Sequence, residues 1–360
     1  MSGSNRKSKI ENPKSPHVFH IPDALGNQTL VAALRGWKPD LSWGDAKLLL
    51  TSRRVSVNGA ICVDHGRRVK KGDVVHLFDT PRTPQPTADD VELLYCDPQV
   101  VVVVKPALMT TLRHHEERKW PAARKNLQPT LDEVLPQLVQ QWESPRAARP
   151  QHGKPRGGQR RPVRGPDRSR AKLPKVIAVH RLDRDTSGVM VFARTPAAEH
   201  NLVKQFKKHS NERVYRAVVH GHPAAQTFDT RFVRDRGDGQ RGSTADESDE
   251  SAERAVTHIR PIGRLGDYSL IECVLETGRT HQIRIHLSEA GHLLCGDPIY
   301  RKRLNAPPLD DASGAPRLAL HAARLAFDHP QTGERLDFEA PLPDDLERFV
   351  KQLRRRSGSA

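Results

Sequence analysis

Short apolar runs separated by polar turns fill much of the chain after residue 90, and they limit the folds it can adopt. Examples are residues 100–104, 176–179, 189–192, 214–219 and 270–275. Apolar runs of about four to eight residues between turn signals predict buried strands. Residues 282–287 alternate polar and apolar, which also predicts a strand, whereas residues 197–208 have helical spacing. We therefore expect residues 90–345 to form a large α+β domain built on a mixed, mainly antiparallel sheet.

Residues 28–79 carry the pattern of a second, smaller α+β domain. Two helical segments come first, and Ser42 is positioned to cap the second. An alternating stretch then ends in Asn58-Gly59, which is a hairpin signal. The order of helix, helix and hairpin resembles the S4-like RNA-binding domain, which implies that its basic residues, including Arg53 and Arg54, bind RNA. A generic α+β module with a solvated basic face remains the alternative.

Five segments lack the apolar residues that a core requires, so we expect them to be flexible. The insertion at residues 144–175 is the most extreme, with eleven Lys and Arg against one acid, Asp167. It either adds sequence-independent affinity for RNA or serves as a spacer. The other four are a basic tail at 1–27, a linker at 80–89, an acidic loop at 234–254 and a basic C-terminal tail at 346–360.

The formal net charge of +16 favours a polyanionic partner, because Lys and Arg neutralise phosphates. The sequence contains no apolar run near the ~20 residues of a membrane span. The four cysteines have no Cys-x-x-Cys spacing, so neither a zinc site nor a disulfide framework is expected. We expect a soluble, cytoplasmic protein with no bound metal and no membrane partner, and nothing in the sequence requires more than a monomer.

Three polar motifs lie among the predicted strands. Residues 180–188, His-Arg-Leu-Asp-Arg-Asp-Thr-Ser-Gly, join two apolar runs, which is where functional groups are commonly displayed. Residues 277–286, Thr-Gly-Arg-Thr-His-Gln-Ile-Arg-Ile-His, follow another apolar run. In residues 213–217, Tyr215 shares a strand face with Arg213. A carboxylate, an arginine and an aromatic ring are thus available for one site.

Together these motifs resemble the RluA-type pseudouridine synthase family, with supporting similarity at residues 296–300 and 320–322. The resemblance covers most of the 90–345 region outside the two insertions. It implies that Asp183 is the catalytic nucleophile, that Arg284 pairs with it and that Tyr215 stacks on the target base. It further implies that a uridine is detached from its ribose and rejoined through carbon, with no cofactor.

The resemblance leaves the RNA target open. Ribosomal RNA is favoured over transfer RNA, because an S4-like domain and a basic insertion suit a large structured RNA. A non-catalytic RNA-binding factor is the alternative. A methyltransferase or nuclease would need a Gly-rich loop or a carboxylate cluster, and neither is found. The further candidates for RNA contacts are His180, Arg181, Arg279, His281, Gln282 and Lys105.

Two positions depart from the family pattern. Val104 precedes Lys105-Pro106 where the family usually has Asn, and Arg213 stands where lysine is common. Both changes leave the expected reaction class intact.

Overall fold

The structure is a computed structural model that describes residues 17–58, 60–79, 85–144, 173–237, 239–246, 248–301 and 307–358. The chain divides into two compact units, one of residues 1–85 with 119–128 and one of residues 86–118 with 129–360. Nearly all of the predicted basic insertion lies outside the described residues, as do residues 1–16 and 80–84.

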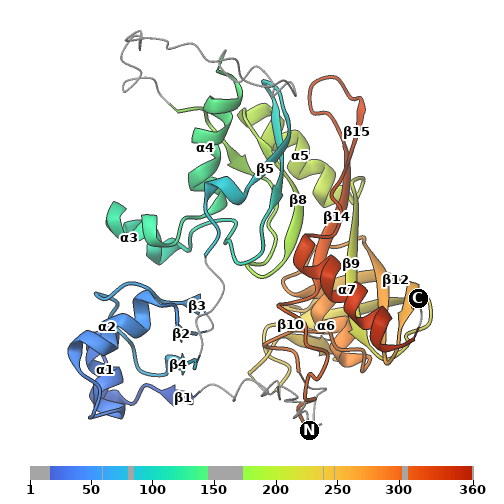
Figure 1. The fold of residues 1–360 in the computed structure, drawn as a ribbon. Coiled ribbons are helices and arrows are strands. Elements are labelled where there is room, and N and C mark those ends of the chain that lie inside the picture. Colours follow the sequence, from blue (N-terminus) through green and yellow to red (C-terminus); the bar gives the residue numbers. More distant parts are fainter. Residues whose placement is uncertain are drawn as a thin grey trace, which may run out of the picture. The chain divides into compact units, whose positions relative to one another are not determined.

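The first unit contains a four-stranded antiparallel sheet and short helices (Figure 1). The strand order is β1-β4-β2-β3, comprising β1 (His17–His20), β4 (Val74–Leu77), β2 (Val55–Val57) and β3 (Ala60–Ile61). The other elements are η1 (Asp23–Leu25), α1 (Leu30–Trp37), α2 (Trp43–Thr51) and α3 (Ala122–Leu127). As predicted, the Ser42 side chain caps α2 by accepting a hydrogen bond from the Asp45 amide. The helix–helix–hairpin order is therefore present.

Two boundaries of this unit differ from the prediction. Residues 17–20, assigned to a flexible tail, pair with β4, because Phe19 stacks on Trp37 with ring centroids 4.5 Å apart. Residues 119–128, assigned to the second domain, cluster with the first unit. There the Gln128 side chain donates a hydrogen bond to the Ile61 carbonyl. Neither contact leaves a local signal in the sequence.

The second unit is built on one mixed sheet, so the predicted α+β class is confirmed. Its strand order is β11-β10-β12-β13-β9-β14-β8-β6-β5, with β15 beside β14 and β7 beside β8. The β8–β14 pair is parallel and the other pairs are antiparallel. The strands are β5 (Glu92–Cys96), β6 (Val100–Lys105), β7 (Ile177–Ala178), β8 (Ser187–Ala193), β9 (Glu212–His220), β10 (Gln226–Val233), β11 (Gly242–Thr244), β12 (Glu253–Leu265), β13 (Tyr268–Leu275), β14 (Leu320–Asp328) and β15 (Arg335–Glu339).

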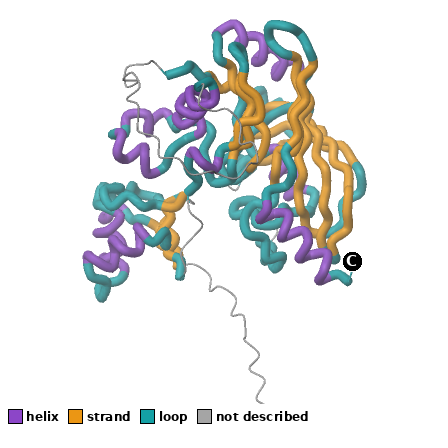
Figure 2. The backbone as a smooth tube through the Cα atoms, turned by 45° about the horizontal axis from the view of Figure 1, so that its top comes forward, coloured by secondary structure: helices purple, strands orange, loops and turns teal. Residues whose placement is uncertain are grey.

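Helices cover both faces of the sheet around β6 and β8, as the tube in Figure 2 also shows. The alternating valines of β6 divide between two cores, Val101 and Val103 in one, Val100 and Val102 in the other. One core includes α4 and the other includes α5. A strand buried on both faces needs an uninterrupted apolar run, which β6 has. The helical elements of this unit are η2 (Ala88–Asp90), η3 (His115–Lys119), α4 (Leu131–Trp142), α5 (Pro196–Lys208), α6 (Gln282–Glu289) and α7 (Asp344–Arg356).

Three predicted segments have a different structure. Residues 282–289 form helix α6 rather than a strand, and residues 282–288 are all buried. The polar–apolar alternation was misleading because the polar side chains there are buried with hydrogen-bond partners. The predicted C-terminal tail is largely helix α7, whose Phe349 and Leu353 join a buried cluster. The predicted acidic loop contains β11, which pairs with β10.

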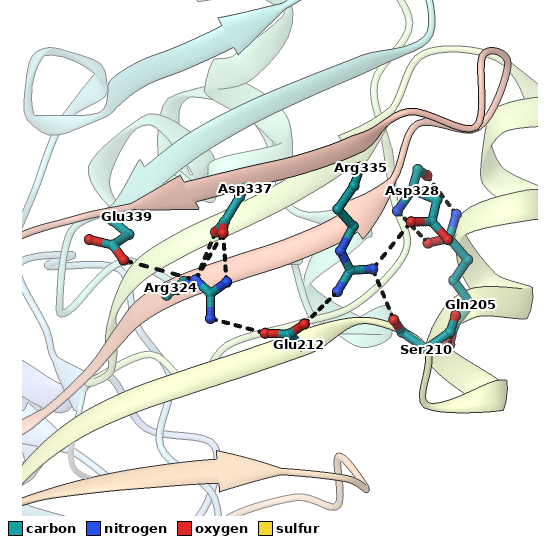
Figure 3. A network of polar contacts seen from close by, with 8 residues as sticks. All are labelled: Gln205, Ser210, Glu212, Arg324, Asp328, Arg335, Asp337 and Glu339. Atoms are coloured by element: carbon teal, nitrogen blue, oxygen red, sulfur yellow. Dashed lines mark hydrogen bonds and ion pairs between the residues drawn. The ribbon is translucent and has the colours of Figure 1, made fainter.

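Ion pairs between exposed side chains link strands β9, β14 and β15 (Figure 3). The Glu212 carboxylate accepts hydrogen bonds from Arg324 and Arg335, both at 3.0 Å. Arg324 also forms a two-pronged contact with Asp337 across the β14–β15 hairpin. The side chains of Arg324, Asp337 and Glu212 are 32%, 43% and 52% exposed. Ion pairs this exposed contribute about 0–1 kcal/mol each.

Candidate active site

The predicted nucleophile, Asp183, lies in the loop that connects β7 to β8. Residue 188 must be glycine where this loop enters β8, because a side chain there would collide with the Ala322 carbonyl of the parallel neighbour β14, 2.2 Å from an ideal Cβ. Gly188 also has φ of +130°, a conformation that other residues rarely adopt. The Thr-Ser-Gly end of the motif thus brings the loop close against β14.

Two buried side chains, Lys105 and Thr111, hold this loop in place through hydrogen bonds to its backbone. The Lys105 ammonium, at the end of β6, donates to the carbonyls of Pro106, Met109 and Arg184 at 2.8–3.2 Å. The Thr111 hydroxyl bonds both the carbonyl and the amide of Leu182. The residues on either side of Asp183 are therefore anchored to the segment after β6.

Lys105 was predicted to contact RNA, and the structure shows instead that it is fully buried. Burial lowers the pKa of Lys105 to about 7, against the opposing effect of Asp185 and Asp183. Its three carbonyl contacts make it a positioning residue for the Asp183 loop. The prediction was wrong because a lysine at the end of an apolar strand gives no sign of which way its ammonium group turns.

Asp183 opens into a cavity of about 450 Å³. Its side chain is 19% exposed, so it is shielded while still reachable from solvent. The Arg284 Nη1 and the His281 Nε2 both lie 3.8 Å from Asp183 Oδ2. The cavity lining includes all of the residues proposed for catalysis: Asp183, Tyr215 and Arg284.

Arg284 makes its close ion pair with Asp297. The Nε and Nη2 atoms donate to the two Asp297 oxygens at 2.8 and 2.7 Å, which leaves Nη1 facing Asp183. Arg284 is 3% exposed. Burial acts to lower the pKa of Arg284, but the hydrogen bonds and charge of Asp297 outweigh it, so the net shift is upward. The guanidinium is thus a permanent cation near Asp183, held by a second carboxylate.

Arg284 thus lies at ion-pair distance from Asp183, as expected, but its hydrogen bonds go to Asp297. Asp297 takes the two-pronged position, and its Oδ1 also accepts the amides of Ile299 and Tyr300. Sequence reasoning used residues 296–300 only as support for the family resemblance. The Asp297 side chain next to a glycine and a proline was the available signal for this partner.

His281 closes one side of the cavity. It precedes α6 with φ of +60°, and its Nδ1 is 2.9 Å from the Tyr300 hydroxyl. Burial lowers the pKa of His281, opposed by the charge of Asp183. Burial also raises the pKa of Tyr300 to about 12. A neutral imidazole with one nitrogen bonded to Tyr300 and the other toward Asp183 is the arrangement that these contacts favour.

Tyr215 lies on β9 and presents its ring to the same cavity. It is 9% exposed, and burial raises its pKa to about 12, so the phenol stays protonated at neutral pH. Arg213, two residues earlier on β9, places its guanidinium over the Phe206 ring, 5.6 Å from the centroid. Its Nη2 donates to the Glu276 carbonyl at 2.6 Å, which fixes the turn before α6.

Two more predicted RNA contacts serve the fold. The His180 ring stacks on Phe206, and its Nε2 accepts the Val191 amide. Burial lowers the pKa of His180 to about 3, so it is neutral. Gln282 is buried, and its amide bonds Thr277, the Arg279 amide, Thr257 and the Val256 carbonyl. The polar atoms used in these bonds are not free for RNA.

The predicted arginines have different environments. Arg181 is exposed at the cavity and has no hydrogen bond or ion pair with any residue that the structure describes. Arg279 also lines the cavity, and its guanidinium pairs with Glu253. In the first unit, Arg54 donates to the Phe78 carbonyl, while Arg53 is half-buried with φ of +58°. Of these four, Arg181 has the guanidinium most available to an RNA strand.

One group of potential metal ligands occurs among the described residues. Donor atoms of His220, Cys295 and Asp311 lie within 4.8 Å of one another. None of the three lines the Asp183 cavity. His220 and Asp311 form an ion pair at 3.2 Å, which accounts for their proximity. Within the described part of the chain, no helix is both long enough and apolar enough to cross a bilayer.

Comparison with known families places these residues in context. Residues 99–289 match the model of the RNA pseudouridylate synthase family. That range holds the Asp183 loop, Tyr215 and Arg284.

Individual relatives agree with the family match. An uncharacterized RNA pseudouridine synthase of Synechocystis is 32% identical over 93% of both chains. The ribosomal large subunit pseudouridine synthase D of Zymomonas mobilis is 46% identical over 49% of this chain and 55% of its own length. Its namesake in Neisseria meningitidis is 41% identical over 52% of this chain and 51% of its own length. The chain thus spans about half the length of these two relatives.

The solved structure of human RNA pseudouridylate synthase domain containing 4 shares the fold. It has a TM-score of 0.52 and 24% identity, and the match covers 73% of this chain and 93% of that one.

Proposed function

The chain belongs to the RNA pseudouridylate synthase family, and we propose that it isomerises uridine to pseudouridine in RNA with Asp183 as the nucleophile. The observation that carries this proposal is the single cavity that collects Asp183, Arg284 and Tyr215 from three separate segments of the chain. A carboxylate, a fixed cation and an aromatic face are the groups that this chemistry needs.

The isomerisation balances without any external reagent. The bond between the ribose C1′ and the uracil N1 breaks, the base turns, and a bond forms between C1′ and C5. The proton on C5 is lost and N1 gains one. No electron acceptor or donor is required, so the residues of the cavity suffice in principle. The fate of the C5 proton also supplies an assay.

Asp183 is suited to the first step because it is reachable yet shielded. A carboxylate can add to C1′ or take a proton from the ribose, and the geometry is compatible with both routes. The Arg284 Nη1 lies 3.8 Å from Asp183 Oδ2, so a fixed positive charge faces the carboxylate. The distance leaves room for Asp183 to move toward a ribose. Because Asp297 holds Arg284, the cation stays in place when Asp183 is engaged.

Tyr215 is suited to hold the extruded base. Removing a uridine from its stack costs a few kcal/mol, and stacking on an aromatic ring returns about 1–3 kcal/mol. The Tyr215 ring lies in the same cavity as Asp183, with Leu275 and Ile283 as apolar neighbours in the lining. Exposed Arg181 at this cavity is the candidate for contacting the RNA around the vacated position.

Large-subunit ribosomal RNA is the substrate we favour. Two of the relatives, 46% and 41% identical over about half of this chain, are named for that substrate. The net charge of +16 and the helix–helix–hairpin unit fit a large polyanion. Transfer RNA remains the alternative, and a cytoplasmic monomer acting without cofactor or metal is the simplest form of the proposal.

Release of tritium from RNA labelled at uridine C5 tests the proposal directly. The wild-type protein is expected to release tritium, and Asp183→Asn is expected to lose release by about 10⁴-fold or more, since loss of a nucleophile costs on that order. Asp185→Asn is the matched control, because Asp185 is two residues away and pairs with Arg184 instead. Release by Asp183→Asn at the control's rate would contradict the assignment, and binding without release by the wild type would favour a non-catalytic RNA-binding protein.

A further inference from the structure

A second cavity of about 580 Å³ lies beside the Asp183 cavity and is formed mainly by the segment expected to be an acidic loop. Arg279 lines both cavities. The second cavity is lined by residues from β10 to the start of β12 and by two residues before α6. They are Phe232, Val233, Arg234, Asp235, Arg241, Asp249, Ser251, Glu253, Arg279 and Thr280. The two cavities therefore adjoin at the residue that leads into α6.

The acids of the second cavity already have partners. Asp235 accepts the amides of Gly237 and Gly239, and Asp249 accepts the amide and hydroxyl of Ser251. Glu253 pairs with Arg279 at 2.5 Å. Arg234 and Arg241, by contrast, make no ion pair or hydrogen bond with any described residue. The lining thus carries three arginines and three acids, and Arg234 and Arg241 are the two arginines with no direct partner among the described residues.

Arg241 is the more informative of the two because it is half-buried. A guanidinium that is partly removed from water and has no direct partner among the described residues keeps its donors available, so an incoming anion can bind to them. The charge of Arg241 also reaches the Asp183 cavity. Burial is the largest cause of the lowered pKa of His281, and the charges of Arg284 and Arg241 add to it.

The strand that directly follows Arg241, β11, is fixed to the helix that carries Arg284. Ser243, two residues after Arg241, donates its amide and hydroxyl to Glu289 at the end of α6, at 2.8 and 2.6 Å. Arg236 pairs with the same carboxylate. Because Arg284 lies on the same helix, these contacts fix the position of the second cavity relative to the Asp183 cavity.

We propose that Arg241 and Arg234 form a binding subsite for a backbone phosphate of the RNA strand, next to the nucleotide held over Asp183. The inference rests on the proposed function for the identity of the strand. An arginine fork matches two phosphate oxygens, and a phosphate contact fixes the register of the strand without regard to sequence. The subsite holds the neighbouring phosphate while the target nucleotide occupies the first cavity.

Equilibrium binding in the Asp183→Asn background tests the subsite without requiring turnover. The probe is a short fluorescein-labelled single-stranded RNA of mixed sequence, titrated with the full chain at several KCl concentrations. Arg241→Gln is expected to weaken binding by about 10- to 100-fold, the range for losing a charge-assisted hydrogen bond. The slope of log K against log[salt] is expected to fall by about 1, and by about 2 in the Arg234→Gln/Arg241→Gln double variant.

Two further variants separate charge from structure. Arg241→Lys keeps the charge and is expected to keep the wild-type salt slope. Arg348→Gln, which removes an exposed arginine of α7, is the matched control and is expected to change neither slope nor affinity. The subsite is overturned if Arg241→Gln behaves like Arg348→Gln, or if Arg241→Lys lowers the salt slope as much as Arg241→Gln does.

Failure of the subsite and failure of the proposed function give different results. With Asp183 restored, Arg241→Gln is expected to raise KM for tritium release and to keep the rate at saturating RNA within about twofold, because a phosphate contact acts on binding. Tritium release with unchanged salt slopes would remove the subsite alone. Changed slopes with no release by the wild type would remove the synthase activity and leave the phosphate subsite standing.

Discussion

Replacing Asp297 by Asn tests whether Arg284 depends on it. Arg284 is 3% exposed and gives two of its nitrogens to Asp297. The substitution keeps the shape of the side chain and removes its charge, so a buried guanidinium loses its close counter-ion. Breaking a buried pair by removing one partner costs about 3–5 kcal/mol. The residual amide oxygen keeps one hydrogen bond, so we expect a loss near the lower end, about 3 kcal/mol.

The Arg324–Asp337 pair supplies a matched control. It has the same two-pronged geometry, at 2.8 and 2.6 Å, but its side chains are 32% and 43% exposed. An exposed pair contributes about 0–1 kcal/mol. Asp337→Asn should therefore leave stability almost unchanged. The two pairs share their contact geometry and differ in burial, and Arg324 also keeps Glu212 as a second carboxylate partner.

Thermal and urea unfolding monitored by circular dichroism give the two values. For a unit of this size, about 3 kcal/mol corresponds to a midpoint lowered by roughly 6–12 °C. Tritium release by Asp297→Asn should also fall below that of Asp337→Asn, because Arg284 can then turn toward Asp183. Equal stability losses in the two variants would refute the claim that Asp297 compensates a buried charge.

Two further predictions concern Tyr215 and the buried histidines. Tyr215→Phe should keep RNA affinity, while Tyr215→Leu should weaken it by about 5- to 100-fold because the stacking face is lost; equal affinities, measured by fluorescence titration, would contradict the stacking role. Burial lowers the pKa of His180 to about 3, and of His286 and His321 to about 4, all below the unfolded value near 6.5. Below pH 6.5 the unfolded state then binds more protons than the folded state, so the free energy of unfolding should fall as pH drops from about 6.5 to 4. His286→Asn should reduce the slope of the free energy of unfolding against pH by up to about 1.4 kcal/mol per pH unit. A flat urea-unfolding profile over this range would contradict it.

The sequence predicted the parts of the site that depend on chain-local pattern. The Asp183 loop was placed between two buried strands because its polar residues interrupt apolar runs, and the structure has β7 and β8 there. Tyr215 was assigned to a strand for the same reason and lies on β9. The α+β class followed from many short apolar runs.

The sequence could not supply the parts that depend on which groups meet in space. Arg284 had two carboxylates within reach, and only the fold shows that Asp297 takes the close position. Helix α6 was mistaken for a strand, because burial on all sides removes the usual contrast between polar and apolar faces. Lys105 gave no sign of its three carbonyl partners. Each error involves a buried polar group whose partners cannot be read from a local sequence pattern.

A pseudouridine map of cellular ribosomal and transfer RNA tests the central claim most directly. The map is made in cells that lack the gene and carry either the wild-type chain or Asp183→Asn at matched protein levels. The proposal predicts that the wild-type chain restores pseudouridine at specific positions, with large-subunit ribosomal RNA favoured, and that Asp183→Asn restores none. Identical maps in cells with the wild-type chain and cells without the gene, or full restoration by Asp183→Asn, would contradict it.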